Sequence, residues 1–146
     1  IIRFVLYETR TEKILLSKEI EYMEKYIALQ KIRTANENYV HFSVIGSIGD
    51  KVIAPMIFIP FIENAFKHTT NKKVENAITI NIFIDDESIR LICENKYDSK
   101  VVQHTSGGLG NELIQKRLSL IYPERHILEV TNDNEFYRVN LIIRNG

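Results

Sequence analysis

Hydrophobic residues recur at helical spacing near the start of the chain. Between residues 14 and 33 there is no Gly or Pro, and Ile20, Met23 and Ile27 follow one another at three- and four-residue intervals with Glu and Lys between them. This spacing places the apolar side chains on one face of an amphipathic helix. Ser17 can cap the N-terminus of this helix, and Glu19 and Glu21 in its first turn suit the positive end of the helix dipole.

Alternation of apolar and polar residues predicts strands in much of the remaining chain. The alternating runs span residues 40–44, 78–84, 88–95, 126–131 and 136–144. Gly46 and Gly49 end the first run in a turn. The polar triplets 85–87 and 132–134 join the later runs into two hairpins, and hairpin-linked strands are antiparallel.

Two further helices are predicted between the strands. The strongly apolar segment 56–68 has Pro60 near its first turn, where a missing amide donor is tolerated. The segment 97–110 is polar and ends in glycines, which indicates a mobile loop, and a helix is expected over 111–121. The opening segment 1–7 has the pattern of the tail of another helix and lacks an initiator Met, which predicts further protein upstream.

This order of elements predicts the fold class. A helix, a strand, a helix, a hairpin, a helix and a second hairpin are expected to form an α/β two-layer sandwich, with a mixed, largely antiparallel sheet and helices on one face. The 146 residues fit one hydrophobic core, and 45% of them are hydrophobic.

Composition excludes several classes of partner. Lys plus Arg equals Asp plus Glu at 19 each, so no net charge attracts the chain to nucleic acid or to an anionic membrane. No run of about 18 apolar residues predicts a membrane-spanning helix. The single cysteine, Cys93, lies in an apolar stretch and reads as a small buried side chain, which favours a reducing, cytoplasmic setting.

The helix predicted over 56–68 carries four polar residues at its end. Glu63 and Lys67 are four residues apart and share one face, as do Asn64 and His68. One side of the helix could therefore offer a carboxylate, an amide oxygen, an ammonium and an imidazole to one ligand. The alternative is a surface ion pair between Glu63 and Lys67, with His68 at the negative end of the helix dipole.

Glycines precede the helix expected over 111–121. In Gly107-Gly108-Leu109-Gly110 the bare backbone amides and the positive helix end after them can bind phosphate. A flexible linker is the alternative explanation of such a sequence.

Taken together, these segments resemble a known family. Glu63-Asn64-Ala65-Phe66-Lys67-His68 is similar to the asparagine box of the ATP-binding superfamily that histidine kinases share with type II topoisomerases, heat-shock chaperones and mismatch-repair ATPases. Gly108-Leu109-Gly110, followed by Gln115-Lys116-Arg117-Leu118 and Tyr122-Pro123, resembles the second glycine box of LytS-type sensor kinases. Upstream, a further set of residues resembles the helix that leads into that domain: Leu16, Glu19, Tyr26, Gln30 and Arg33.

The resemblance implies a role for each matched position. Asn64 would coordinate magnesium against the ATP phosphates, Lys67 and His68 would contact phosphate, and Glu63 would orient the reacting group or act as a base. The remaining nucleotide-binding positions would be Asn95, Gly107, Gly108, Leu109, Gly110 and Asn111. The implied fold is the Bergerat ATP-binding fold over 34–146, with 1–33 as the tail of a dimerisation region and a linker helix.

The chain departs from the family at two places. Where the adenine box has Asp and two glycines, this chain reads Cys93-Glu94-Asn95-Lys96-Tyr97. Asn95 can accept a hydrogen bond from the adenine amino group, although less strongly than a carboxylate. A residue that ends a strand in a turn is the alternative for Asn95. After the glycines stands Asn111, which is expected to cap the helix and face phosphate.

The implied function is phosphoryl transfer from magnesium-ATP to a histidine, by the catalytic domain of a two-component sensor histidine kinase. The acceptor histidine would lie on a dimerising helix upstream of Ile1. The implied partners are ATP, that helix and a response regulator, in a homodimer anchored to the membrane elsewhere, with no nucleic acid and no direct membrane contact by this segment. Two other classes stay open: a degenerate nucleotide-binding or scaffold module that acts by protein interaction, and an ATPase of the topoisomerase or mismatch-repair kind.

Overall fold

The computed structural model describes residues 13–33, 39–69, 77–96, 108–133 and 135–144, with the backbone alone for 108–111. In chain order the elements are β1 (Ile14–Leu15), α2 (Leu16–Ile32), β2 (Val40–Ile45), β3 (Val52–Ile53), α3 (Ile59–His68), β4 (Ile78–Ile84), β5 (Ser88–Lys96), α5 (Gly108–Ile121), β6 (His126–Asn132) and β7 (Phe136–Arg144). The helix expected over 1–7 lies outside the described residues, as do residues 97–107 of the loop expected over 97–110.

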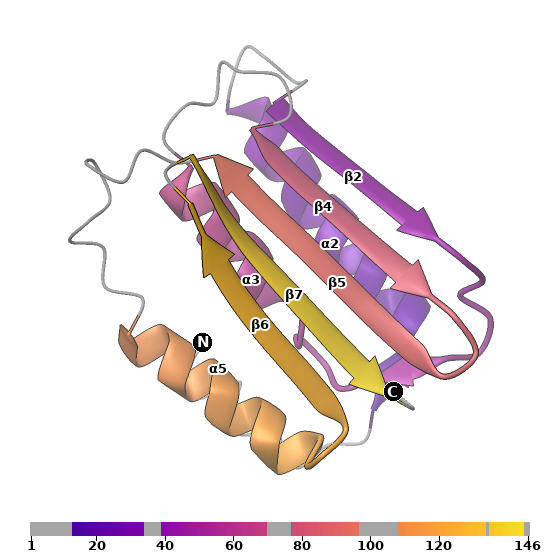
Figure 1. Cartoon of the computed structure of the whole chain (residues 1–146). Helices are drawn as coiled ribbons and strands as arrows, with labels where there is room; N and C mark the ends of the chain where they lie inside the picture. Colours follow the sequence, from indigo (N-terminus) through magenta and orange to yellow (C-terminus); the bar gives the residue numbers. More distant parts are fainter. Residues whose placement is uncertain (1–12, 34–38, 70–76, 97–107, 134, 145–146) are drawn as a thin grey trace.

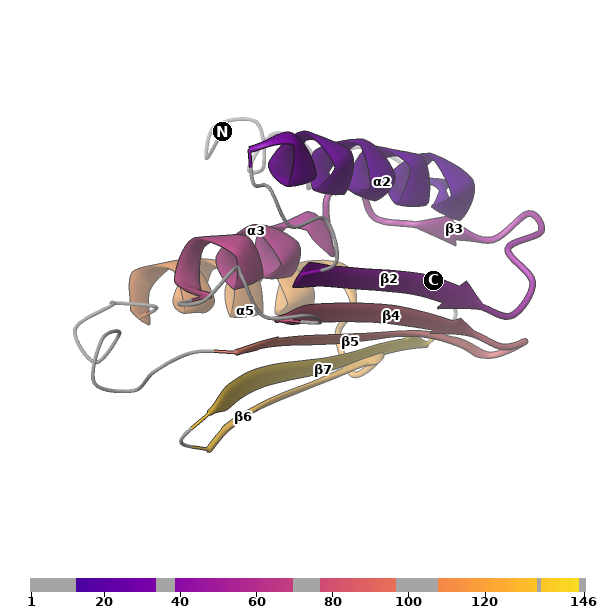
Figure 2. The same ribbon diagram turned by 90° about the horizontal axis from the view of Figure 1, so that it is seen from above.

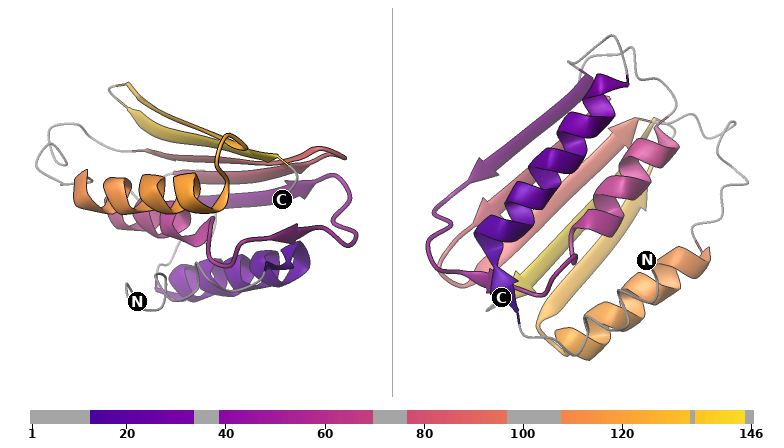
Figure 3. Two further views of the ribbon diagram at one scale, coloured as in Figure 1. Left: turned by 90° about the horizontal axis from the view of Figure 1, so that it is seen from below. Right: turned by 180° about the vertical axis from the view of Figure 1, so that it is seen from behind.

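One mixed sheet forms the first layer of the molecule. Its strand order is β2-β4-β5-β7-β6, with β2 parallel to β4 and every other neighbouring pair antiparallel. All three described helices lie on the same face, with α2 over β2 and β4, α3 over the centre and α5 beside β6 (Figures 1 and 3). The edge view shows this separation into a sheet and a helical layer (Figure 2). The predicted fold class is confirmed.

The core lies between the two layers, as the alternation in the sequence requires. In β4 the four isoleucines at 78, 80, 82 and 84 are buried against the helices, and the residues between them are partly exposed. Helix α2 contributes Ile20, Met23 and Ile27 to the same core. Helix α2 thus packs with the rest of the chain. The domain boundary expected at residue 33 stays a prediction.

Helix α2 begins differently from the prediction. Ile14 and Leu15 are extended and pair antiparallel with β3, so the helix starts at Leu16, whose amide donates to the Lys51 carbonyl at 2.8 Å. Leu15 occupies the N-cap and no side chain caps the helix, so the prediction for Ser17 is wrong. Of the described helices, none has the length and apolar character needed to cross a bilayer.

The acidic residues predicted for the start of α2 have separate roles. Glu19 lies in the first turn and is buried, and its carboxylate accepts backbone hydrogen bonds from a neighbouring segment. Glu21 is exposed and forms an ion pair with Lys25 at 3.2 Å. A buried carboxylate was not expected from the pattern, because Glu at a helix start is usually solvated.

The turn after β2 and the start of α3 depend on unusual backbone angles. Gly46 has a φ of 111°, and a Cβ there would lie 2.1 Å from the Ile84 carbonyl oxygen, so glycine is required. Met56 has a φ of 57°, which interrupts the predicted helix. Helix α3 therefore begins at Ile59, three residues later than expected, with Pro60 in its first turn as predicted.

Candidate nucleotide site

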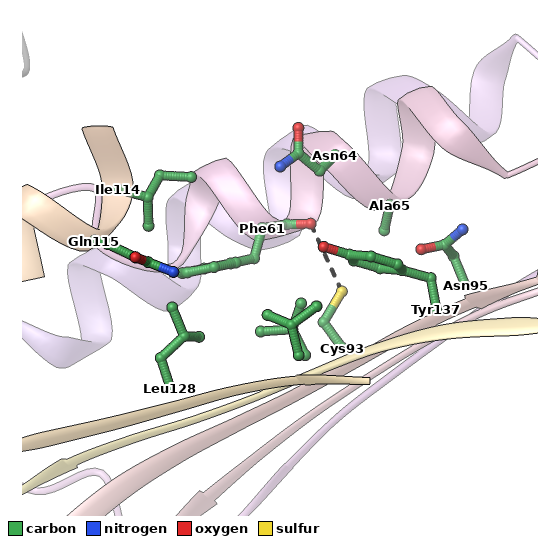
Figure 4. A pocket seen from close by; sticks show the side chains of 11 residues that line it. Phe61, Asn64, Ala65, Cys93, Asn95, Ile114, Gln115, Leu128 and Tyr137 are labelled. Atoms are coloured by element: carbon green, nitrogen blue, oxygen red, sulfur yellow. Dashed lines mark hydrogen bonds between the residues drawn. The ribbon is translucent and has the colours of Figure 1, made fainter. Parts of the chain in front are cut away.

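A cavity lies between α3, α5 and the strands β5, β6 and β7 (Figure 4). Its volume is about 20 Å³, room for one or two water molecules. The described residues thus supply walls of a site without enclosing a space for a whole nucleotide. The lining residues are Phe61, Asn64, Ala65, Cys93, Asn95, Ile114, Gln115, Leu128, Val130, Tyr137 and Val139.

Helix α3 turns one of its faces to the cavity. Phe61, Asn64 and Ala65 lie on that face, because residues three and four apart stack on a helix. Phe61 and Ala65 are buried, whereas Asn64 is half-buried at the side of the cavity farther from the sheet (Figure 4). The Asn64 amide therefore borders both the cavity and solvent.

Glu63 lies on a different face of α3 from the cavity-lining residues. It is half-buried near α2, where its charge contributes to raising the pKa of Tyr26, after the larger effect of burial. Burial raises the pKa of Glu63 itself. Lys67 is exposed, and among the described residues no ion pair joins it to Glu63. The surface pair offered as an alternative is therefore absent.

His68 ends α3 and is half-buried outside the cavity lining. Burial, and then the charge of Lys67, lower its pKa, so the imidazole is neutral at physiological pH. The next residue, Thr69, donates its backbone amide to Ala65 at 3.1 Å and its hydroxyl to the Lys96 carbonyl at 2.9 Å. These bonds fix the end of α3 beside the end of β5, which carries Asn95.

Asn95 is a buried polar residue on the core face of β5. It is 2% exposed and follows Ile89, Leu91 and Cys93 along the same face of the strand. Its Nδ2 lies 3.5 Å from the Lys96 carbonyl, and within the described part of the chain no donor meets its Oδ1. The side chain borders the cavity and keeps an acceptor available to a ligand.

The cysteine beside Asn95 is part of the core, as predicted. Cys93 is buried and its Sγ lies 3.8 Å from the Phe61 carbonyl (Figure 4). Burial, and then the charge of Glu94, raise the pKa of the thiol to about 12, so it is not a nucleophile at neutral pH.

The glycine segment has a different conformation from the expected turn. Helix α5 begins at Gly108, so Gly108, Leu109 and Gly110 form its first turn, and Gly107 lies outside the described residues. Asn111 is inside the helix, so the prediction that it caps α5 is wrong. The free amides of a first helical turn can still bind an anion. Further along α5, Ile114 and Gln115 border the cavity.

The cavity also contains residues that sequence reasoning missed. Tyr137 lies directly across the sheet from Asn95, in the antiparallel register of β5 and β7. The alternation of β7 placed Tyr137 on the same face as Val139 and Leu141, but the register between the two hairpins was not readable from the sequence. Gln115 is part of the sequence that resembles the helix after the second glycine box, but no role was predicted for it.

Comparison with known proteins agrees with this architecture. No family model matches the chain. Over 112 residues it is 27% identical to the sensor protein kinase HptS of Staphylococcus aureus, a match that covers 75% of this chain and 21% of that protein. The chain thus spans about a fifth of the length of the curated relatives it matches.

Solved structures give the same fold. The Acinetobacter baumannii histidine kinase AdeS matches with a TM-score of 0.62 and 10% identity, over 92% of this chain and 67% of that chain. The nucleotide-free catalytic domain of histidine kinase ThkA matches with a TM-score of 0.59 and 14% identity, over 92% and 97%. The chain has the fold of a histidine kinase catalytic domain. The match to ThkA covers nearly all of that domain, and the relatives found by sequence are sensor kinases.

Proposed function

We propose that the chain is the ATP-binding catalytic domain of a two-component sensor histidine kinase of the LytS type. The observation that carries the proposal is the cavity between α3 and α5, where two asparagines from separate elements, Asn64 and Asn95, border one space. The fold of histidine kinase catalytic domains and the sensor-kinase relatives support the same proposal.

Two residues that line the cavity, and the first turn of α5, each suit one part of magnesium-ATP. Asn64, half-buried at the rim, offers an amide oxygen of the kind that magnesium accepts, and magnesium keeps waters and phosphate oxygens as its other ligands. Asn95 offers Oδ1 to the amino group of adenine. The first turn of α5, at Gly108 to Gly110, would receive the phosphates. The residues proposed around that turn also include Gly107 and Asn111.

Three further residues of α3 are proposed to take part in phosphoryl transfer, two of them at the phosphates and one at the acceptor. Lys67 is exposed and can turn its ammonium toward a phosphate above the cavity rim. His68, neutral at physiological pH, can donate one hydrogen bond to a phosphate oxygen. Glu63, whose pKa is raised by burial, is proposed to orient the acceptor side chain or take its proton.

The remaining features concern the longer protein. We propose that the phosphate passes to a histidine upstream of this segment, on a helix that dimerises the protein, and then to a response regulator. Residues 1–33 are proposed to be the tail of that dimerisation region and its linker helix, before an ATP-binding domain over 34–146. The proposed location is the cytoplasmic side of a membrane-anchored sensor.

A second candidate function follows from two observations. The neutral Asn95 replaces a carboxylate, and the cavity within the described residues has a volume of about 20 Å³. Both favour a degenerate module that acts through protein interaction. Such a module would either not bind magnesium-ATP with a saturable 1:1 stoichiometry or bind it without using Asn64.

Titration of the chain with ATP, with and without magnesium, separates the two functions. The kinase proposal predicts saturable 1:1 binding that magnesium strengthens, and an Asn64→Ala variant with most of that magnesium dependence removed. Lys31→Ala, a change of an α2 residue away from the cavity, is the control and should bind as the original chain does. Absence of binding, or an unchanged magnesium effect in Asn64→Ala, would favour the interaction module.

A further inference from the structure

The segment 54–58, which connects β3 to α3, is held by side chains of two helices that flank it. It belongs to neither a strand nor a helix, and it contains Pro55 and the left-handed Met56. Side chains of α2, of α5 and of Tyr122, the residue after α5, bond five of its backbone groups. A segment of this kind takes its position from those side chains.

Helix α2 holds the segment through the Glu19 carboxylate. Oε1 accepts the Met56 amide at 2.9 Å, and Oε2 accepts the Phe58 amide at 3.3 Å. Glu19 is 2% exposed, so both bonds form away from water, where a hydrogen bond is stronger than in solvent. Burial raises the pKa of the Glu19 carboxyl, and the Met56 and Phe58 amides and then the charge of Arg117 oppose that rise.

Arg117 of α5 and Tyr122, the residue that follows this helix, hold the same segment. Arg117 donates from Nη1 to the Met56 carbonyl at 3.0 Å and from Nη2 to the Pro55 carbonyl. The Tyr122 hydroxyl accepts the Ala54 amide at 2.8 Å. Both side chains are buried. We refer to Glu19, Arg117 and Tyr122 as the clamp.

Met56 is the residue on which the clamp converges. Its φ of 57° lies in the left-handed region, which a residue with a long side chain rarely adopts. Glu19 binds its amide and Arg117 binds its carbonyl. Strained backbone of this kind persists where surrounding groups impose it, and it concentrates near functional sites.

The clamp lies at the ends of the two helices that border the cavity. Helix α3 begins at Ile59, immediately after Phe58, and reaches Asn64 within two turns. Arg117 is one turn beyond Ile114 on α5, and Ile114 borders the cavity. The spacing of α3 and α5 across the cavity therefore depends on how the segment 54–58 is held.

We propose that Glu19 and Arg117 are positioning residues of the nucleotide site, which set the position of α3 relative to α5 and so tie nucleotide affinity to the placement of α2. This inference rests on the proposed function. Stability alone gives little reason for buried charges here, because well-packed apolar side chains often stabilise a core as well or better. Neither residue contacts the cavity, so their effect passes through the backbone of 54–58.

The test compares ATP binding by the original chain, Glu19→Gln and Arg117→Lys in the presence of magnesium. Gln keeps the shape of Glu but offers one acceptor oxygen in place of two, and Lys cannot reach two carbonyls with a planar fork. The expected result is full 1:1 stoichiometry with a Kd about 2- to 30-fold weaker, the range over which residues outside a ligand site modulate binding.

The control is Ile20→Ala, which removes a buried apolar side chain next to Glu19. It should lower Tm and leave the Kd of the folded protein unchanged, since a destabilised chain loses binding sites rather than affinity. If a charge variant does not fold, Tyr122→Phe, which deletes one oxygen, is used in its place and should weaken binding by a smaller factor.

The outcomes distinguish the two claims. An unchanged Kd in the clamp variants, or an equal loss of affinity in Ile20→Ala, overturns the positioning role while the proposed function stands. Failure of the original chain to bind ATP overturns the proposed function and this inference with it.

Discussion

Asn95 is a buried polar residue that fold stability explains poorly. Its neighbours on the same face of β5 are apolar, and an amide buried there without strong hydrogen bonds costs roughly 1–3 kcal/mol. The bond to the Lys96 carbonyl, at 3.5 Å, is at the long limit of a hydrogen bond. A ligand that donates to Oδ1 would account for the residue.

Leu has a similar shape to Asn and no polar group. Replacement of Asn95 by Leu is therefore predicted to weaken recognition of the adenine base and to leave recognition of the phosphates unchanged. ATP affinity should fall about tenfold, which corresponds to roughly 1.4 kcal/mol, while affinity for GTP changes little. Comparison of the two Kd values for this variant and for Asn64→Ala checks the prediction. Asn64→Ala should weaken both nucleotides alike, and equal losses for both in Asn95→Leu would contradict the role of Asn95.

For single residues, the sequence predicted which polar groups the helix carries better than which side of the helix each group faces. Glu63 and Asn64 were expected to serve one ligand, but adjacent residues of a helix point about 100° apart. Asn64 therefore borders the cavity while Glu63 lies near Tyr26 of α2. Only the packing of α3 between α2 and α5 decides which of them borders the cavity, and helical spacing does not contain that information.

Among the elements, the hairpin of β4 and β5 is closed by a single carboxylate. Asp85 Oδ1 accepts the amides of Glu87 at 2.9 Å and Ser88 at 2.7 Å. These backbone bonds, that of Glu87 first, lower the pKa of Asp85 below its ordinary value of 3.8. The ionised side chain thus stabilises the turn.

The pH dependence of the Asp85 effect follows from the direction of that shift. Because the folded pKa is depressed, the stabilisation is present above pH 3.8 and is lost as pH falls through the folded pKa. Asp85→Ala should therefore lower Tm by a few degrees at pH 7, and by less near pH 3. Thermal melts at both pH values measure the change in Tm, and Asp86→Ala, a change in the same turn, is the control. A Tm difference that is equal at both pH values would contradict the prediction.

Element prediction succeeded where the periodic pattern was long. The alternating isoleucines predicted β4, and the apolar repeat predicted α2. The strands β1 and β3 were missed because each has two residues, too few to show alternation. Helix α5 was expected to begin after its glycines, since glycine disfavours helix, yet Gly108 and Gly110 are helical.

For the whole molecule, α2 is part of the core rather than an attachment to it. Four of its apolar side chains are buried, Leu16, Ile20, Met23 and Ile27, and Glu19 holds the segment before α3. Burial of side chains of this size contributes about 1.5–3 kcal/mol each, and a domain's total stability is about 5–15 kcal/mol. Residues on both sides of position 33 therefore share one core.

Removal of residues 1–33 is predicted to abolish cooperative folding at 25 °C. Thermal melts of the fragment 34–146 and of the full chain, followed by circular dichroism, test this. Met23→Ala in the full chain is the control for partial loss of the α2 packing, and it should lower the free energy of unfolding by about 2–5 kcal/mol. A fragment that unfolds cooperatively within a few degrees of the full chain would show that α2 is dispensable.

One nucleotide is proposed to bind in the space between α3 and α5. The most direct measurement is an NMR titration of the isotope-labelled chain with magnesium and a non-hydrolysable ATP analogue. Binding in this space should shift the amide signals of Asn64, Asn95 and Gln115 together in one saturating event, with small changes at the distant turn around Asp85. Saturating shifts that avoid these three residues, or no shifts at all, would contradict it.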